Sequence, residues 1–284
     1  MNPTVQLQKF CIALAKILPL KTADKIATVI GLVSFKTLKE RRSYIKTNLS
    51  YIFSDKAGEA KKLNFYIKNT FINFSHTMVD FFRLGFISKE EIISSVELIG
   101  RENLVRGLSY ETGCVLITPH LGNWDYAGSF LAAIGFPVSA LVEETAPEMF
   151  ELYTKHRERT GMKTFPISRS GYAFLDAIRN NRVLAVVADR DIMKNGITVN
   201  FFSGKRNIPK GLGEIIIKKK LPVLFAYLVL NLPDNKNRYL GVIEPPLLFD
   251  GTINEFNCFM VKKFEEFISH YPDQWFVFHP EWIA

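Results

Sequence analysis

The sequence has few cysteines, and their positions show no pairing. Cys11, Cys114 and Cys258 lie far apart in a chain of 284 residues. Small disulfide-stabilised domains and structural zinc sites need several closely spaced cysteines, so this pattern argues against both and is typical of a reducing compartment. The histidines at positions 156, 270 and 279 also lack metal-ligand spacing. We therefore expect no metal ion and no bound cofactor.

The chain also lacks a long uninterrupted apolar run. Between Phe10 and Phe35 the apolar residues are interrupted by lysine, threonine and aspartate, so no stretch reaches the ~18–20 uncharged residues that a spanning helix needs. A cleaved signal peptide fits poorly, because no small-residue cleavage site follows a clean apolar core. The pattern instead predicts two amphipathic helices that separate near Pro19. Such helices either pack on the core or lie in a membrane interface with lysines at the headgroups, and the two arrangements are compatible.

Acidic residues are scarce in the first quarter of the chain. Residues 1–70 hold 13 Lys and Arg against 4 Asp and Glu, whereas the remaining residues hold 23 against 24. A basic segment binds nucleic acid or an anionic membrane surface. No nucleic-acid motif is present, and the basic residues alternate with aliphatic ones, so we expect an anionic membrane as the partner and no nucleic acid.

What the sequence does contain is enough apolar material for a large core, arranged in two regions. Hydrophobic residues make up 48% of the chain, which argues against disorder. We expect residues 1–90 to form a helical, basic, membrane-associating segment and residues 91–284 to form an α/β domain. In the second region short β-prone runs alternate with helical stretches, which indicates a mixed-direction central sheet covered by helices. The expected strands are 114–118, 138–142, 164–167, 183–188, 198–202, 223–230 and 239–243, and a helix is expected near 254–270.

The most informative stretch is an apolar run, 114–118, that feeds a sharp turn and then a helix. At the carboxyl edge of a sheet such a turn lies where ligands bind. His120 falls in the turn and Asp125 in the first helical turn, so the carboxylate can hold one imidazole nitrogen and leave the other as a general base. The alternative is a turn histidine beside a helix-capping aspartate. Gly122 permits a close approach of backbone or substrate, and we assign it, with Asn123, to substrate binding.

The sequence PHLGNWD at 119–125 resembles the catalytic block of the lysophospholipid and lipid A acyltransferase superfamily. Further blocks similar to those of the family follow in the family's order over most of the chain. The likeness is closest to the branch that contains the lipid A late acyltransferases (lauroyl and myristoyl transferases) and the phosphatidylinositol mannoside acyltransferases. The further blocks are RERTGM at 157–162, ADRD at 188–191 with VNFF at 199–202, Pro222-Val223, and YPDQWFVFH at 271–279.

This resemblance implies a glycerolipid acyltransferase-like fold and a membrane-associated O-acyltransferase. The enzyme would move a fatty acyl group from an acyl carrier protein or coenzyme A thioester to a hydroxyl of a glycolipid such as a lipid A precursor. His120 and Asp125 would act as the general base, at the cytoplasmic face of a bacterial inner membrane. A phosphatidylinositol mannoside or a lysophospholipid is an alternative acceptor. A non-catalytic lipid-binding protein on the same fold is a rival, and a thioesterase or serine hydrolase lacks its G-x-S-x-G elbow here.

The resemblance also assigns roles to the other charged residues. Asp189 is expected to assist the catalytic histidine, and Arg190 to hold a phosphate or stabilise the developing oxyanion. Arg157 is either a helix-terminal cation or a ligand for substrate phosphate or sugar. Lys205 and Arg206 either bind the phosphates of the thioester donor or the anionic group of the acceptor, or belong to a solvated loop.

Overall fold

The protein is described here by a computed structural model that covers residues 3–54, 58, 62–231, 237–279 and 281–283. Within these residues a seven-stranded sheet forms the centre, with the strand order β1-β9-β8-β2-β5-β3-β4. Strands β8 and β9 pair antiparallel, and the other neighbouring pairs are parallel, so the expected mixed α/β sheet is confirmed. The strands are β1 (Val96–Ile99), β2 (Cys114–Thr118), β3 (Val138–Val142), β4 (Lys163–Pro166), β5 (Val183–Val187), β8 (Val223–Leu230) and β9 (Tyr239–Ile243).

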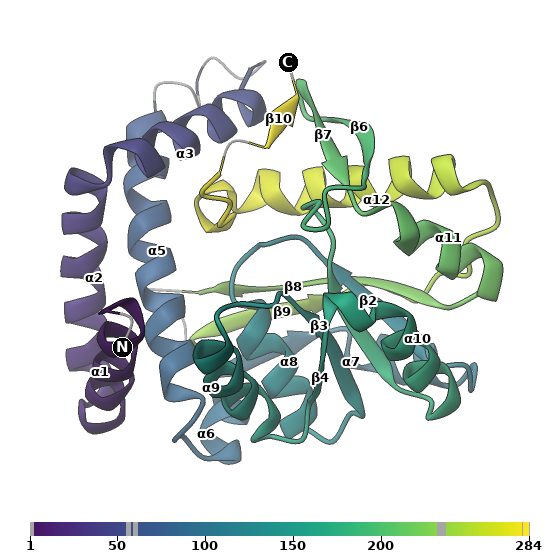
Figure 1. The fold of residues 1–284 in the computed structure, drawn as a ribbon, viewed down its shortest axis with the longest axis horizontal. Helices are drawn as coiled ribbons and strands as arrows, with labels where there is room; N and C mark the ends of the chain where they lie inside the picture. Colours follow the sequence, from purple (N-terminus) through teal and green to yellow (C-terminus); the bar gives the residue numbers. More distant parts are fainter. Residues whose placement is uncertain (1–2, 55–57, 59–61, 232–236, 280, 284) are drawn as a thin grey trace.

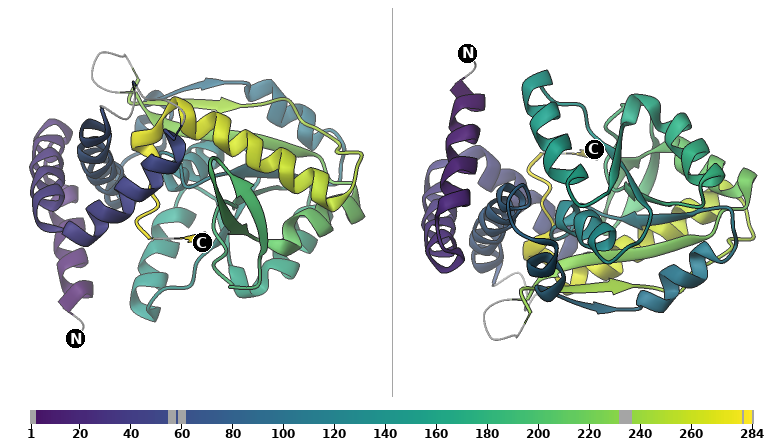
Figure 2. Two further views of the ribbon diagram at one scale, coloured as in Figure 1. Left: turned by 90° about the horizontal axis from the view of Figure 1, so that it is seen from above. Right: turned by 90° about the horizontal axis from the view of Figure 1, so that it is seen from below.

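Helices cover both faces of this sheet, as Figures 1 and 2 show. Because both faces are covered, the central strands are apolar along their length; β8 reads VLFAYLVL. Alternate side chains enter two separate cores, since successive residues of a strand point to opposite faces. One core lies against α7 (Arg101–Leu108) and α8 (Trp124–Ala133), and the other against α10 (Ser170–Arg179), α11 (Lys210–Lys219) and α12 (Ile253–His270).

A second, smaller sheet was not expected from the sequence. The loop predicted around Gly204 is strand β7 (Gly204–Ile208), which pairs antiparallel with β6 (Ile197–Phe201) on one side and with β10 (Trp282–Ile283) on the other. Its partner β10 lies more than 70 residues later in the sequence, so no local pattern predicts the pairing. Strand β1 was also missed, because four residues are too few to establish a period.

The N-terminal region is helical. Helices α1 (Pro3–Ile17) and α2 (Leu20–Thr37) separate at Pro19, as predicted, and α2 packs along α5 (Leu63–Arg83) at one side of the molecule (Figure 1). Three further helices are α3 (Lys39–Ile52), α6 (Lys89–Ser94) and α9 (Pro147–Glu158). Among the described residues, none of the helices combines the length and apolarity required to cross a bilayer. The domain boundary at residue 90 stays a prediction.

A polar network ties this helical layer to the sheet. Arg238 donates to Asp80 over 2.6 Å and to both carboxylate oxygens of Asp24 over 2.7 and 2.9 Å, and His76 approaches Asp24 to 3.0 Å. Burial acts to raise the pKa of Asp24, but hydrogen bonds and charges from His76 and Arg238 outweigh it and lower the pKa to about 2. Asp24 is therefore ionised at neutral pH and holds α2 to the start of β9. His76 is thus a structural residue.

Candidate active site

The turn after β2 is held from behind by the C-terminal tail. The His120 carbonyl accepts from the Phe276 amide over 2.8 Å, and the Gly122 amide donates to the Gln274 carbonyl over 2.9 Å. At Gly122 φ is +64°, and an added Cβ would lie 1.9 Å from the Leu228 carbonyl oxygen. Only glycine tolerates both the conformation and the contact. The tail that resembles the family's ending therefore positions the turn.

His120 forms the centre of the site with Asp189. Its Nδ1 lies 2.5 Å from Asp189 Oδ1, and its backbone amide donates to the same oxygen over 3.0 Å. The other carboxylate oxygen accepts from Trp275 Nε1 over 2.8 Å. The aspartate is fully buried and His120 nearly so. Three donors thus fix one carboxylate against one imidazole ring.

The sheet register explains why these two residues meet. Strands β2 and β5 are parallel neighbours, with Thr118 opposite Val187. His120 comes two positions after Thr118, and Asp189 comes two positions after Val187, so both lie at the same carboxyl edge of the sheet. The chain continues from β2 to β3 on one side and from β5 eventually to β8 on the other side of β2. Such a switch point is where open α/β sheets bind ligands.

The Asp189 carboxyl group is ionised. Burial acts to raise its pKa, but the charges of His120 and Arg206 and the hydrogen bonds from His120 and Trp275 outweigh burial and hold the pKa well below its usual range. A carboxylate accepts and does not donate, so the proton in the 2.5 Å contact belongs to Nδ1 of His120. The other ring nitrogen, Nε2, is then the one that can accept a proton.

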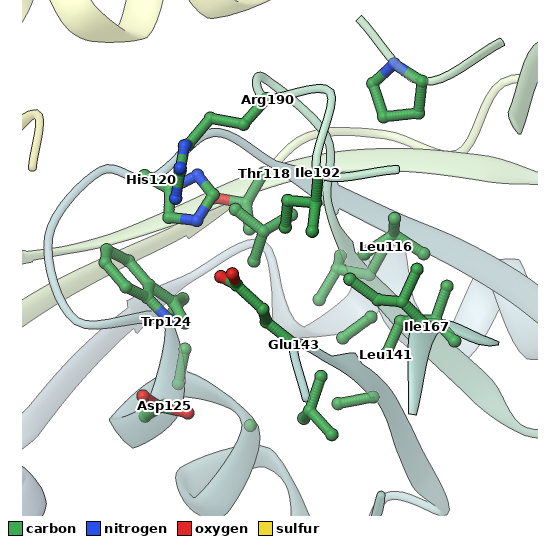
Figure 3. Close-up of a pocket in the computed structure, with 18 of the residues that line it drawn as sticks. Leu116, Thr118, His120, Trp124, Asp125, Leu141, Glu143, Ile167, Arg190 and Ile192 are labelled. Atoms are coloured by element: carbon green, nitrogen blue, oxygen red, sulfur yellow. The ribbon is translucent and has the colours of Figure 1, made fainter. Parts of the chain in front are cut away.

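Asp125 is not the partner of His120, and the predicted pairing is wrong. Asp125 Oδ1 accepts from Arg157 Nε over 2.7 Å. The side chain lies in the first turn of α8 and faces α9, whose last turn carries Arg157. In Figure 3 Asp125 lies below Trp124, away from the His120 ring. Asn123 caps α8, so Asp125 belongs to the first turn of the helix, and its carboxylate faces Arg157 rather than the His120 ring.

A cavity of about 680 Å³ opens beside His120. Small residues of α8 and of the sheet are among those that line it: Ala127 and Gly128 on the helix, and Ala185, Ala226 and Gly241 on the strands. The cavity also reaches α10 and α11 on the other face of the sheet. Larger apolar residues complete the wall: Leu98, Leu116, Phe130, Leu131, Leu141, Met162, Ile167, Phe174, Leu212, Leu228 and Ile243. The interior is therefore suited to a hydrocarbon chain.

Charged residues gather at the mouth of this cavity. Arg190 and Glu143 line it near His120, as Figure 3 shows, and Arg41, Arg157 and Lys210 also line it. Arg190 Nε donates to Glu281 over 2.6 Å, and the Arg157 guanidinium lies 5.5 Å from the centre of the Phe81 ring. The lining also carries the carboxylates of Asp125, Glu143 and Asp191, so charges of both signs accompany the apolar interior. The cations are candidate partners for an anionic group of a lipid.

The structure does not place Gly122 or Asn123 at the cavity, which corrects their assignment to substrate binding. Asn123 caps α8 by accepting from the Tyr126 amide over 3.0 Å, and its amide group donates to the Tyr239 hydroxyl over 2.8 Å. Tyr239 in turn donates to Asp80. Asn123 therefore joins the turn after β2 to the network of Arg238, Asp80 and Asp24. Gly122 and Asn123 both fix the backbone conformation of this turn.

Lys205 and Arg206 also lie outside the cavity lining. The Lys205 side chain is exposed, and Arg206 is fully buried, with its guanidinium bonded to Glu281. They lie on β7 rather than on a loop, so successive side chains point to opposite faces of the small sheet. The placement corrects the assignment of Arg206 to the phosphates of a donor, because solvent does not reach it.

Two residues of the site were missed from the sequence. Trp124 meets His120 edge to face at 4.9 Å between ring centres and lines the cavity. Trp275 donates to Asp189. The available signal was the position of Trp124 inside the block 119–125 and of Trp275 inside the block 271–279. Neither block indicates which way the indole ring points.

Comparison with known proteins gives a family and named relatives. A family model described as bacterial lipid A biosynthesis acyltransferase matches residues 4–283. The chain is 26% identical over 212 residues to a protein of Mycobacterium tuberculosis (strain ATCC 25618 / H37Rv) named phosphatidylinositol mannoside acyltransferase, covering 72% of this chain and 66% of the relative. A protein of the same name from Mycolicibacterium smegmatis is 24% identical over 208 residues, covering 72% and 67%. The chain thus spans about two thirds of the length of these relatives.

Proposed function

The chain belongs to the bacterial lipid A biosynthesis acyltransferase family, and from this premise we propose that it is an O-acyltransferase. It transfers a fatty acyl group from a thioester donor to a hydroxyl of a glycolipid. The observation that carries the proposal is the His120–Asp189 pair at the head of an apolar cavity. The pair supplies a base, and the cavity supplies room for the acyl chain.

The chemistry needs no nucleophile from the protein. Nε2 of His120 takes the proton of the acceptor hydroxyl as its oxygen forms a bond to the thioester carbonyl carbon. The tetrahedral intermediate collapses, the C–S bond breaks, and the leaving thiolate takes the proton back from the imidazolium ring. Asp189 keeps Nδ1 protonated and stabilises the positive ring between the two steps. General-base assistance of this kind contributes roughly 10²–10⁴-fold to the rate.

The cations at the cavity mouth fit the polar parts of the two substrates. Arg190 lies beside His120 and is our candidate for stabilising the oxyanion of the tetrahedral intermediate. Arg157, fixed by Asp125, is our candidate for a phosphate or sugar of the acceptor, because its planar fork suits oxyanions. In this assignment Asp125 positions an arginine and does not touch the base.

We propose a lipid A precursor as the acceptor and an acyl carrier protein or coenzyme A thioester as the donor. A mannosylated phosphatidylinositol is the second candidate acceptor, because the relatives named above carry that activity in their names. A lysophospholipid is a third. All three are lipids with a free hydroxyl near an anionic group, which is the chemistry that the mouth of the cavity matches.

We also propose that α1 and α2 dock the enzyme on the cytoplasmic face of a bacterial inner membrane. Apolar side chains on these helices face solvent: Phe10 is 60% exposed, Val29 59% and Val33 53%. Lysines flank them at positions 9, 16, 21, 25 and 36. An exposed apolar surface with basic neighbours is suited to the interface of an anionic bilayer.

The test is a panel of donors and acceptors with purified protein in detergent. Acyl carrier protein and coenzyme A thioesters are paired with a lipid A precursor, a mannosylated phosphatidylinositol and several lysophospholipids, and His120→Ala serves as the control. We expect transfer to one glycolipid, lost by at least about 10²-fold in a folded His120→Ala protein.

The other outcomes separate the rival functions. Thioester loss without an acylated lipid, or an acyl-enzyme trapped by mass spectrometry, contradicts direct transfer and favours a thioesterase. Lipid binding without any turnover supports a non-catalytic lipid-binding protein. A His120→Ala variant with turnover near that of the wild type removes the general-base mechanism.

A further inference from the structure

Arg206 is a fully buried arginine with little hydrogen bonding. Its guanidinium is bonded to Glu281, while Nε and Nη1 have no hydrogen-bond partner among the described residues. Three aromatic rings surround it, with centres 5.4 Å (Phe201), 4.9 Å (Trp275) and 5.2 Å (Trp282) from the guanidinium carbon. The cation is therefore held by ring faces and by charge rather than by a full set of acceptors.

Such burial is unfavourable for stability. A buried charge with unmade hydrogen bonds loses solvation that ring contacts only partly replace. Replacing a buried ion pair by apolar residues of similar volume is often neutral or stabilising. Burial accordingly lowers the pKa of Arg206, while the charges of Asp189 and Glu281 act to raise it. A residue that served packing alone would not need the charge.

The charge faces the catalytic pair through one side chain. Trp275 offers its ring face to the Arg206 guanidinium, and its Nε1 donates to the Asp189 carboxylate over 2.8 Å. Arg206 thus stands behind the indole ring whose edge fixes Asp189. Its charge acts on an anion in the buried interior, where electrostatic effects are stronger than at the surface.

We propose that Arg206 is a positioning residue that, with Trp275, fixes the Asp189 carboxylate and opposes uptake of a proton by the His120–Asp189 pair. The proposal rests on the acyl transfer proposed above, since only a neutral His120 ring serves as the base. Arg206 touches neither substrate nor the reacting atoms. Its effect is to keep the base available at lower pH than the pair alone would allow.

The charges around the pair set the direction of each test. Arg206 is faced by Asp189, Glu281 and Arg190. On the packed elements around it, Lys205 is exposed on β7 itself, and the α12 carboxylate Glu265 accepts from the Phe202 amide. The other acidic, basic and histidine side chains that line the cavity are Arg41, Asp125, Glu143, Arg157, Asp191, Lys210 and His279. Removing Arg206 removes a nearby cation, whereas removing the charge of Glu281 removes a nearby anion.

The experiment compares the pH dependence of kcat/KM for the wild type, Arg206→Met, Arg206→Lys and Glu281→Gln. We expect the midpoint of the acid limb to move to higher pH in Arg206→Met, by about one pH unit. Arg206→Lys keeps the charge and restores the wild-type midpoint. Glu281→Gln leaves the midpoint in place or moves it to lower pH. The thermal midpoint of Arg206→Met is expected to equal or exceed that of the wild type.

Other patterns overturn the proposal. An unchanged acid limb in folded Arg206→Met, with a lower thermal midpoint, means that the residue only supports packing. An upward shift in Glu281→Gln equal to that in Arg206→Met means that the segment, not the cation, matters. If Arg206→Met does not fold, Arg206→Lys and Glu281→Gln still test the sign: the proposal is then contradicted if Glu281→Gln moves the limb upward.

A second readout does not depend on turnover. The imidazole resonances of His120, assigned by comparison with His120→Gln, are followed by NMR over the same pH range. An upward shift of their titration midpoint in Arg206→Met supports the positioning role even if no acyl transfer is found with any donor and acceptor. Equal midpoints in the two proteins contradict the positioning role even if acyl transfer is established.

Discussion

The His-x4-Asp spacing predicts that Asp125 orients His120, but in the structure two different carboxylates hold His120 and Arg157. Asp189 holds Nδ1 of His120, and Asp125 holds Nε of Arg157. The spacing predicts a site at this turn, because a histidine shortly after a buried strand reaches the carboxyl edge of the sheet. It misidentified the partner, because a neighbouring parallel strand brings a residue 69 positions away closer than the helix brings one five positions away.

Asp189→Asn should therefore be much more damaging than Asp125→Asn. An asparagine amide facing Nδ1 favours the wrong tautomer of His120, and loss of a histidine's buried carboxylate costs up to roughly 10⁴-fold in kcat in serine proteases. Asp125→Asn releases Arg157 and is expected to raise the acceptor KM more than it lowers kcat. Steady-state kinetics of both variants, with thermal unfolding as the control for folding, measure this. A larger kcat loss in Asp125→Asn would restore the sequence-based pairing.

Helix α8 both packs on the sheet and lines the cavity, and its sequence indicates only the packing. Its apolar side chains form one core with the sheet, as the composition of the stretch predicted. Ala127 on the helix and Ala226 and Gly241 on the strands line the cavity, whereas Gly128 makes room for Met162, because a Cβ there would lie 2.5 Å from the Met162 sulfur. Small apolar residues are common in helices and strands, so the sequence of either element does not predict a cavity at these positions. The cavity is lined from both the helix and the sheet, so neither stretch of sequence alone indicates it.

Gly241→Val should shorten the acyl chain that the enzyme prefers. Gly241 lies on β9, two strands from β2 and so about 10 Å away, and a Cβ there would lie 3.0 Å from a Leu98 methyl and 3.1 Å from a Leu228 methyl. A valine fills the cavity at that point. We expect the ratio of kcat/KM for long-chain over short-chain thioesters to fall about tenfold or more.

The matched control for this variant is Val242→Leu on the same strand. Val242 does not line the cavity, because successive strand residues point to opposite faces. It should change stability without changing chain preference. An equal change of chain preference in both variants would show that general distortion of β9, and not closure of the cavity, is responsible.

At the scale of the whole molecule, a helical layer and a catalytic domain are joined by buried polar contacts. Asp24 on α2 is tied through Arg238 and Asp80 to Tyr239, and Tyr239 accepts from Asn123 in the catalytic turn. The exposed apolar faces of α1 and α2 lie at one side of the molecule, and α10 and α11 lie at the other (Figure 1). Membrane docking through α1 and α2 would therefore set the orientation of the cavity mouth as well.

Val29→Asp combined with Val33→Asp should weaken membrane binding. Both side chains lie on the exposed face of α2, and burying each valine contributes about 1.5–3 kcal/mol. We expect at least about tenfold less co-sedimentation with vesicles of phosphatidylglycerol and phosphatidylethanolamine. Tyr172→Asp, at a residue 61% exposed on α10, is the control and should bind like the wild type. Equal loss in control and variant would argue against docking through α2.

The sequence alone determined the α/β class, the break at Pro19 and most strands of the main sheet, because each of these follows from local periodicity or from a helix-breaking residue. Tertiary structure decided the partner of His120, the burial of Arg206 and the cavity beside His120. These depend on which strands become neighbours, on a β10 strand from the end of the chain, and on how a helix and the sheet together line the cavity. Strand order and side-chain direction are set by packing among distant segments, which no local pattern contains.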